Sequence, residues 1–421
     1  MKFIYSILFI CLFSLSMIGQ TAVDMPSVGA SYSNFTYYNL ADGAITSHDH
    51  NTWDIAFGVG SFDVGVFVNE AVILSFGTPA PTVALYLTSS TDFASVDTTG
   101  MTQLYNDEVS WAGGAFNAPA DVSNQLDQGW GMYDPQTMNV NGSKIYVIKL
   151  RNNSYKKVMV ESLISGVYTL KYADLDGGNE ETKNITKADF SGKSLAYFSF
   201  ESGSTVDLEP AAWDLLFTRY ATPLSTGPNT FVQYFVTGVL HNAGLEVVQA
   251  DGVDPMTANH EDYVSDYNDT LNIIGHDWKS FQGSWSIISD RVYFVKTRDQ
   301  KIWKIQFFDF EGSSTGISTL ERTFVGDAIT STDEVSTRLA LMEVFPNPAV
   351  DHVNLVFDTT TSTDEAELEI VNQLGQVVQF ERIAVQQGLN AQHVAVDLPS
   401  GTYHLTLKID DDTIVRPLVI R

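Results

Sequence analysis

The chain has 421 residues, of which 44% are hydrophobic and 12% aromatic. This is enough apolar material for more than one core, because single hydrophobic cores stop growing near roughly 250 to 300 residues. The 51 acidic and 23 basic residues give a formal net charge of −28, which repels nucleic-acid phosphates and anionic lipid headgroups. The composition therefore predicts two or three domains and excludes nucleic acid as a partner.

The first segment predicts export. Lys2 is followed by the apolar run Phe3 to Ile18 and then by small and polar residues, which is the pattern of a secretory signal peptide. We assign this signal peptide to residues 1–22. The only cysteine, Cys11, lies within it, so the processed chain would have neither a disulfide nor a catalytic thiol. No later stretch has the roughly 20 apolar residues that span a bilayer.

A five-residue pattern occurs twice in the region that follows. Residues 53–57 read Trp-Asp-Ile-Ala-Phe, and residues 213–217, roughly 160 positions later, read Trp-Asp-Leu-Leu-Phe. Alternate side chains of a strand point to the same face. The pattern therefore predicts that tryptophan, aliphatic residue and phenylalanine share one buried face in each copy.

The flanking segments repeat in the same order. Three positions of the first copy have counterparts at the same offset in the second: Tyr38, Leu40 and Gly43 correspond to Phe198, Phe200 and Gly203. Three later strand segments also recur: residues 145–151, 155–160 and 166–170 correspond to 292–298, 302–307 and 316–320. The glycines suit hairpin turns that need positive φ. We predict an all-β body of two tandem antiparallel units, 23–190 and 191–325, with one short helix at 262–274.

These strand motifs resemble those of the HmuY-like haem-binding proteins of the Bacteroidetes, here in tandem over roughly residues 30 to 325. The resemblance implies an antiparallel β fold that holds haem between two axial histidine or methionine side chains. The best axial pair is His241, which ends an apolar run, and His276, close to Trp278. Met132 is the candidate in the first copy. Under the alternative interpretation these residues fill turns, corners and core space.

Other polar constellations predict structure rather than chemistry. His48-Asp49-His50 provides two imidazoles but too few ligands for a strong zinc site, so a polar loop is expected. Residues 174–181 have the oxygen density for calcium without the spacing of a calcium loop, so a solvated turn is expected. Asp54 and Asp214 are expected to bind backbone N–H groups within their own copies. Because the chain has no hydrolase, phosphate-loop or dinucleotide motif, we predict that it is not an enzyme.

The last part of the chain is predicted to be a separate unit. Residues 326–342 read as a polar linker, and Phe345-Pro346-Asn347-Pro348 then starts an edge strand, because proline cannot occupy a central ladder position. Alternating strands follow around Leu355, Ile370 and Leu405. Residues 343–421 should therefore form a compact antiparallel sandwich of immunoglobulin-like type.

This tail resembles the type A C-terminal sorting domain of the type IX secretion system. The resemblance rests on the Phe345 to Pro348 segment, on Leu374 to Val378 and on Leu398 to Tyr403. It implies that residues 343–421 are recognised by the type IX translocon and that the protein is secreted or held at the outer-membrane surface.

Two hypotheses of function follow from the sequence. The first is an exported, non-catalytic protein that binds haem through His241 and His276. The second is a structural or adhesive β module that contacts glycan or protein at the cell surface, which broad exposed aromatic patches would favour.

Overall fold

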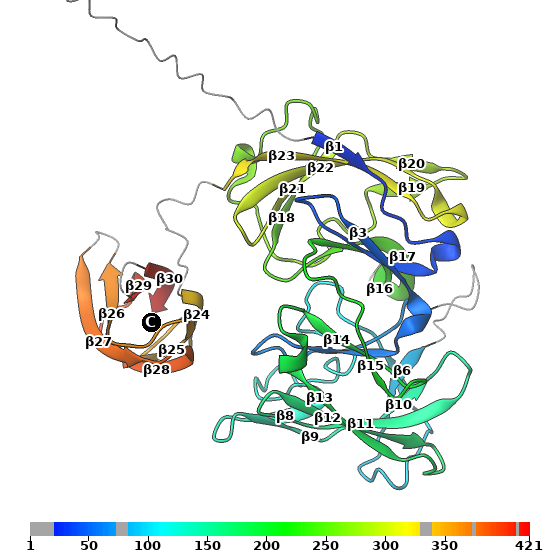
Figure 1. The fold of residues 1–421 in the computed structure, drawn as a ribbon, viewed down its shortest axis with the longest axis horizontal. Helices are drawn as coiled ribbons and strands as arrows, with labels where there is room; N and C mark the ends of the chain where they lie inside the picture. Colours follow the sequence, from blue (N-terminus) through cyan, green and yellow to red (C-terminus); the bar gives the residue numbers. More distant parts are fainter. Residues whose placement is uncertain (1–20, 73–82, 229, 329–338, 373–375, 410–411) are drawn as a thin grey trace, which may run out of the picture. The chain divides into compact units, whose positions relative to one another are not determined.

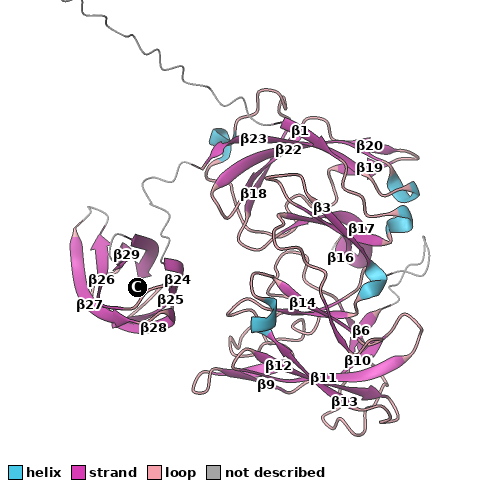
Figure 2. Ribbon diagram, viewed as in Figure 1, coloured by secondary structure: helices cyan, strands magenta, loops and turns pink. Residues whose placement is uncertain are grey.

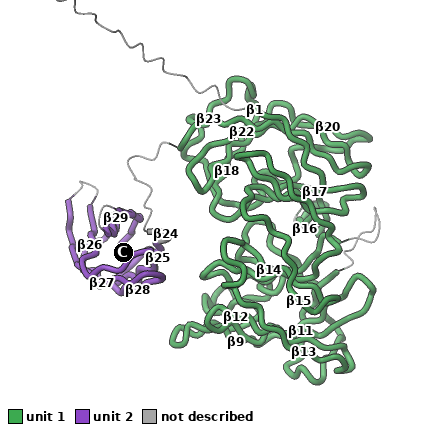
Figure 3. Tube along the Cα trace, in the orientation of Figure 1, with its two compact units in different colours: residues 1–328 green, residues 329–421 purple. Residues whose placement is uncertain are grey.

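The computed structural model describes residues 21–72, 83–228, 230–328, 339–372, 376–409 and 412–421. The chain divides into two compact units, Met1–Ala328 and Ile329–Arg421 (Figure 3). This division falls within the predicted linker 326–342. Residues 1–20 of the predicted signal peptide lie outside the described residues, as do residues 329–338 of the linker.

The all-β prediction is confirmed: strands make up 53% of the structure, and its described residues contain no helix of seven or more residues (Figure 2). The helix predicted at 262–274 is wrong. A 3-10 turn at His260–Tyr263 is followed by turns and bends. There the Asn268 side chain accepts a hydrogen bond from the Thr270 amide at 3.1 Å, and the Asn268 backbone pairs with Val247. Such local side-chain bonds compete with helix formation.

Four sheets stack to form the first unit (Figure 1). One outer sheet has five strands: β1 (Thr21–Asp24), β23 (Ser318–Asp327), β22 (Lys301–Phe310), β21 (Arg291–Lys296) and β18 (Glu246–Asp251). The other outer sheet has eight: β6 (Ala84–Leu87), β7 (Thr102–Leu104), β8 (Gly131–Asp134), β9 (Asn139–Gly142), β10 (Tyr146–Lys149), β11 (Tyr155–Ile164), β12 (Val167–Asp174) and β13 (Glu181–Thr186).

Two four-stranded sheets lie between them. The first, which packs on the five-stranded sheet, has the order β17 (Thr230–His241), β16 (Leu215–Gly227), β2 (Asn34–Tyr38) and β3 (Ile45–Asp49). The second, which packs on the eight-stranded sheet, has the order β15 (Ser204–Val206), β14 (Leu195–Ser199), β4 (Ile55–Gly58) and β5 (Val66–Val68). A small ribbon of β19 (Lys279–Phe281) and β20 (Trp285–Ile287) completes the unit.

The two sequence repeats exchange a hairpin. The β2–β3 hairpin of the first repeat pairs with β16 of the second, with Tyr38 opposite Leu215. The β14–β15 hairpin of the second repeat pairs with β4 of the first, with Phe198 opposite Ile55. Sheet pairing therefore crosses the predicted boundary at residue 190, and each middle sheet contains strands from both repeats.

The turns of the exchanged hairpins follow the prediction. Gly43 and Gly203 have φ values of 74° and 61°, a region that glycine enters without steric cost. The side chain of Asn39 accepts hydrogen bonds from the amides of Ala41 and Asp42 in the first turn, as expected for asparagine in a turn.

The tryptophans of the repeated pattern lie apart from its other apolar residues, contrary to prediction. Ile55 and Phe57 belong to the core between the second middle sheet and the eight-stranded sheet. Trp53 packs instead against a separate core between the two middle sheets. In the second copy Phe217 and Trp213 divide in the same way. The strands begin only at residues 55 and 215, after a bend at each aspartate, so strand alternation does not extend back to the tryptophans.

The second unit is the predicted antiparallel sandwich. Its smaller sheet contains β24 (Leu339–Phe345), β25 (His352–Thr359) and β28 (Gly388–Ala395). Its larger sheet contains β26 (Thr363–Asn372), β27 (Val377–Val385), β29 (Gly401–Ile409) and β30 (Asp412–Ile420). The two sheets share one core that includes Leu355, Ile370 and Leu405. The prediction that Phe345-Pro346-Asn347-Pro348 starts an edge strand is wrong: Phe345 ends the edge strand β24, which pairs with β25 among the described residues, and the prolines follow it.

Candidate functional site

The repeated aspartates hold the exchanged hairpins in place. Asp54 accepts a hydrogen bond from the Phe200 amide at 2.8 Å, and Asp214 accepts one from the Leu40 amide at 2.7 Å. Asp54 is buried and Asp214 is partly buried, and this desolvation raises the pKa of each. The predicted role, binding of backbone N–H groups, is therefore correct. The prediction that each aspartate serves its own copy is wrong, because each N–H group comes from the other copy.

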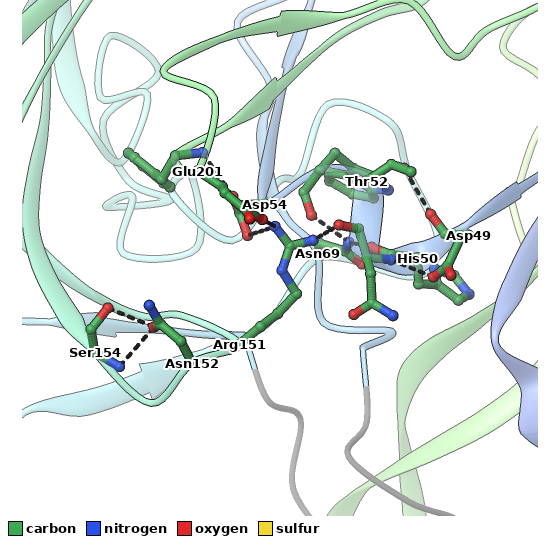
Figure 4. A network of polar contacts seen from close by, with 12 residues as sticks. Asp49, His50, Thr52, Asp54, Asn69, Arg151, Asn152, Ser154 and Glu201 are labelled. Atoms are coloured by element: carbon green, nitrogen blue, oxygen red, sulfur yellow. Dashed lines mark hydrogen bonds and ion pairs between the residues drawn. The ribbon is translucent and has the colours of Figure 1, made fainter.

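The same frame of hydrogen bonds surrounds the aspartate of each repeat. Figure 4 shows this frame in the first copy. The amide of Asn69 donates to the Asp54 carbonyl at 2.8 Å, and its side chain donates to the Trp53 carbonyl at 2.8 Å. Asn242 makes the same two bonds to Asp214 and Trp213 at 2.8 and 2.9 Å. Asn69 and Asn242 thus occupy equivalent positions that sequence reasoning did not identify.

Arginines complete this frame differently in the two copies. Arg151 forms an ion pair with Asp54 at 3.3 Å and approaches Glu201 at 3.7 Å. Arg298 instead donates to the side chain of Asn242 at 2.9 Å and to the Ala243 carbonyl at 2.7 Å. The first copy therefore has a direct buried ion pair that the second lacks.

Equivalent tyrosines meet between the middle sheets. The hydroxyls of Tyr37 and Tyr197 are hydrogen-bonded to each other, 160 positions apart in sequence. Tyr37 also packs against Trp213, with ring centroids 4.9 Å apart, and Tyr197 packs against Trp53 at the same distance. The two repeats are therefore related by an approximate twofold axis that passes near this pair.

A hollow of about 80 Å³ lies beside Tyr197, between the two middle sheets. Six aromatic residues from both repeats contribute to its wall: Phe35, Trp53, Phe67, Trp111, Tyr197 and Tyr220. Three acidic residues from the first repeat also line it: Glu70, Asp107 and Glu108. The hollow combines aromatic walls with convergent polar groups, as small-molecule sites usually do.

Glu70 is the most buried acid of this hollow, with 5% of its surface exposed. Its two carboxylate oxygens accept hydrogen bonds from the Ala221 amide at 3.0 Å and the Asn106 amide at 3.1 Å. Burial, helped by the nearby charge of Glu108, raises the pKa of Glu70 to about 7. Two backbone N–H groups therefore fix a carboxylate at this wall.

Several buried polar atoms at the hollow have no hydrogen-bond partner among the described residues. They are the indole nitrogen of Trp53, the hydroxyl of Tyr220, one carboxylate oxygen of Glu108, the side-chain oxygen of Asn69 and one guanidinium nitrogen of Arg219. Tyr220 itself is only 4% exposed. Unsatisfied buried polar groups are costly and rare in folded proteins, so their presence around one hollow marks it as a candidate ligand site.

Both ring nitrogens of the predicted axial residue His241 lie against backbone carbonyl groups. It is 2% exposed; its Nδ1 lies 2.8 Å from the Asn242 carbonyl oxygen and its Nε2 lies 3.0 Å from that of Thr270. Burial lowers its pKa. His276 lies nearby along the backbone, because Gly275 pairs with Val239, and burial lowers its pKa too.

The other predicted imidazole and thioether groups lie elsewhere. Met132 is 41% exposed on β8, where the Asn124 side chain contacts its sulfur at 3.7 Å. The polar loop expected at residues 48–50 is instead the end of β3 followed by a 3-10 turn. His50 is buried there, and burial together with the Arg219 guanidinium lowers its pKa to about 3.

These residues do not fit an iron porphyrin. An axial histidine needs a free ring nitrogen, and both nitrogens of His241 face backbone carbonyls. The second hollow of this unit, about 270 Å³ and lined in part by Trp213, Asp214 and Arg298, has no histidine or methionine in its wall, and neither does the hollow near Glu70. Both are also smaller than the roughly 300 to 1,000 Å³ of pockets for drug-sized ligands.

The structure gives no ligand set for a metal ion either. Within the described ranges, no three histidine, cysteine, aspartate or glutamate side chains converge. The acid-rich segment 174–181 forms the turn between β12 and β13, where Asp174 pairs with Lys156 at 2.8 Å. In the same ranges no helix has the length and apolarity needed to cross a membrane.

Sequence reasoning missed Glu70, although a signal was present. Glu70 follows the apolar strand Val66–Val68 and precedes Ala71 and Val72. Acidic residues are almost never buried without a partner, so a glutamate within an apolar run deserved a functional hypothesis. The contribution of Tyr220 could not be found, because only the fold brings it to this wall.

Comparisons with known proteins agree with the repeats and the tail. The family model described as HmuY protein matches residues 31–172 and 191–321, more than half of the chain. The model described as secretion system C-terminal sorting domain matches residues 343–421. No curated protein matches the chain. Among solved structures, dimeric latent PorU from Porphyromonas gingivalis aligns with a TM-score of 0.18 and 7% identity over 94% of this chain, which spans 34% of that protein's length.

Proposed function

The chain belongs to the HmuY family, and we propose that it is a non-catalytic protein that holds a small ligand in the hollow between its repeats. Its C-terminal sorting domain at residues 343–421 makes it a secreted or cell-surface protein. The observation that carries the proposal is the set of unpartnered buried polar atoms around the hollow near Glu70.

The arrangement favours binding over catalysis. The carboxylate of Glu70 is held by two backbone N–H groups, and the lining hydroxyls of Thr218, Tyr197 and Tyr220 have no base in hydrogen-bond contact among the described residues. A nucleophile in an enzyme needs such a base within about 2.6–3.2 Å. The enclosed aromatic wall instead suits a ligand that is held unchanged.

Binding can be tested with the purified chain and a panel of small amines, carboxylates, alcohols and sugars. We expect at least one compound class to change tryptophan fluorescence, because Trp53 and Trp111 line the hollow. Ala71→Phe, which places a ring in the hollow, should abolish the response, whereas Ala212→Phe at the second hollow should not. If no compound in the panel binds, or if both variants respond like the parent, the proposal is wrong.

Haem, the ligand that the family resemblance implies, is tested separately. Because His241 offers no free ring nitrogen, we expect haemin to give no Soret shift that depends on His241 and His276. A shift in the parent that disappears in the His241→Ala, His276→Ala double variant would overturn this expectation.

An adhesive role is the second candidate, and one feature favours it. The tip of the β16–β17 hairpin exposes Phe231, Val232 and Tyr234 by 62%, 47% and 57%. Exposed apolar groups of this kind mark contact sites when they are contiguous. Adhesion of cells carrying the protein to glycan or protein surfaces should fall in a Phe231→Ser, Tyr234→Ser variant if this tip is the contact.

We also propose that the tail is the part that the type IX translocon recognises. Deletion of residues 343–421 should leave the protein inside the cell envelope, because the recognised part is then missing. The first unit has its own cores and does not need the tail to fold, so misfolding would not explain the result. Fractionation of cells and medium checks this. Equal export of the truncated and full chains would contradict it.

A further inference from the structure

The hollow near Glu70 presents aromatic faces and negative charge together. Its six rings come from both repeats, and several contact one another: Phe67 and Trp111 have ring centroids 5.8 Å apart, and Trp53 and Tyr197 are 4.9 Å apart. The faces of such rings attract cations, tryptophan most strongly. The carboxylates of Glu70 and Glu108 lie among them.

No protein cation neutralises these carboxylates. The described residues give neither Glu70 nor Glu108 an ion pair. Arg219 is the one basic residue among the described lining residues; its buried Nη1 has no hydrogen-bond partner there, its guanidinium lies 5.9 Å from the ring of Phe235, and no ion pair joins it to either acid. A buried carboxylate without a counter-charge is costly.

The second repeat shows that the fold does not require this acid. Asn69 and Asn242 make the same two bonds to their aspartate and tryptophan, so the residues that follow them are equivalent. These are Glu70 in the first repeat and Ala243 in the second. The hydrogen-bonded frame therefore forms with alanine at this position. The presence of a buried glutamate in the first repeat must have a cause other than the frame.

A second, independent feature points to a ligand. Tyr220 is 4% exposed and lines the hollow, yet its hydroxyl has no hydrogen-bond partner among the described residues. The indole nitrogen of Trp53 likewise has no hydrogen-bond partner among the described residues. Both groups sit on the wall that carries Glu70, so a ligand with a polar group beside its cation would satisfy them.

We propose that this hollow binds a small organic cation: a compact quaternary ammonium carrying a hydroxyl or similar polar group. The inference rests on the proposed binding function and names its ligand class. The cation lies against the rings with Glu70 and Glu108 as counter-charges, and the polar group meets Tyr220 or Trp53. A hollow of about 80 Å³ holds roughly five to eight water molecules, each of which needs roughly 10 to 15 Å³, so the ligand is of choline size.

The test compares three molecules of nearly the same shape with the purified full chain. Choline carries the positive charge, 3,3-dimethylbutan-1-ol replaces the ammonium by a neutral carbon, and 3,3-dimethylbutanoate is an anion. Calorimetry and tryptophan fluorescence should show choline binding at least tenfold more tightly than the alcohol, with no binding of the carboxylate. Equal affinity for choline and the alcohol, or preference for the carboxylate, would overturn the inference.

Variants separate the charge from the wall. Glu70→Gln should weaken choline binding about tenfold and leave the affinity for the alcohol unchanged, whereas Glu161→Gln on β11 should change neither. Trp53→Phe removes no internal hydrogen bond, because its indole nitrogen has no partner, and should weaken choline binding several-fold. Thermal unfolding of each variant verifies folding, and choline affinity that is insensitive to both Glu70→Gln and Trp53→Phe would contradict the site.

The outcomes also distinguish this inference from the proposed function. If other compounds of the wider panel bind and Ala71→Phe abolishes their binding, while choline does not bind, the ligand class is wrong and the binding function stands. If no compound of any class binds, both fail.

Discussion

The two copies of the Trp-Asp hairpin share a backbone frame but differ in what they add to it. In the first copy the hairpin is short, with β4 and β5 of four and three residues, and it leads to Asn69 and the buried Glu70. In the second, β16 and β17 extend to 13 and 12 residues and lead to Asn242 and Ala243. The frame is the part that folding needs, and the differences are where the copies specialised.

The largest effect is expected from removing the frame's carboxylates. Asp54→Ala would leave the Phe200 amide and the Arg151 guanidinium without their partner, so the free energy of unfolding should fall by roughly 2 to 4 kcal/mol. Asp214 makes no such ion pair among the described residues, so Asp214→Ala should lower the free energy of unfolding by only about 1 to 3 kcal/mol. Urea unfolding of the full chain measures both. Equal losses would show that the Arg151 pair adds nothing.

A smaller effect is expected at the twofold axis. Tyr37→Phe or Tyr197→Phe leaves one buried hydroxyl unpaired, which should cost about 1 to 2 kcal/mol each. The double variant should cost less than the sum, because it removes both hydroxyls together. Strict additivity in a double-mutant cycle would mean that the two hydroxyls do not interact.

A comparable effect, which appears only as a pH dependence, is expected from Glu70. Its pKa is raised to about 7 from an ordinary value of 4.5, so the folded state binds this proton more tightly than the unfolded state. The stability from this group is present below pH 4.5 and is lost as the pH rises to 7. Glu108 and Tyr105 interact with it electrostatically, and Asp107, Arg219 and Tyr220 are the other titratable groups that line the same hollow.

Glu70→Gln should therefore flatten the pH dependence of unfolding between pH 4.5 and 7, relative to the parent, by roughly 2 to 3 kcal/mol. Denaturant unfolding at a series of pH values checks this. Glu161→Gln on β11 is the control and should leave the slope unchanged. A parent slope identical to that of Glu70→Gln would contradict the raised pKa.

The smallest effect is expected at the extended hairpin of the second copy. Phe231→Ser and Tyr234→Ser remove side chains that are mostly exposed, so stability should change by less than about 0.5 kcal/mol. A loss of more than about 1 kcal/mol would mean that the tip packs against something in the folded chain.

Much of this architecture could be predicted from local sequence patterns. Strand alternation and the glycines at 43 and 203 identified the hairpins, and the proline-containing segment at 345–348 indicated the tail sandwich, although the first strand of that sandwich, β24, lies before the prolines. The exchange could not be predicted, because the β2–β3 and β14–β15 hairpins present nearly the same apolar pattern and either partner sheet would accept either hairpin.

The candidate site was harder to predict for the same reason. Its wall joins Phe35 and Glu70 of the first repeat to Leu216 and Tyr220 of the second, and no sequence spacing relates them. His241 illustrates the opposite error: an imidazole at the end of an apolar run suggested a ligand, whereas backbone carbonyls of Asn242 and Thr270 take both of its nitrogens. A histidine's role depends on neighbours that the sequence does not reveal.

The pairing of β1 with β23 has a consequence for how the chain is made. Thr21 lies opposite Thr323, and the β2–β3 hairpin pairs with β16. The strands that are synthesised first therefore pair with strands that are synthesised much later. Such long-range topology slows folding and leaves edges open meanwhile. We expect a chain that is shortened at any point between residues 50 and 214 to need a chaperone, and the complete body to fold as one late, concerted event rather than repeat by repeat.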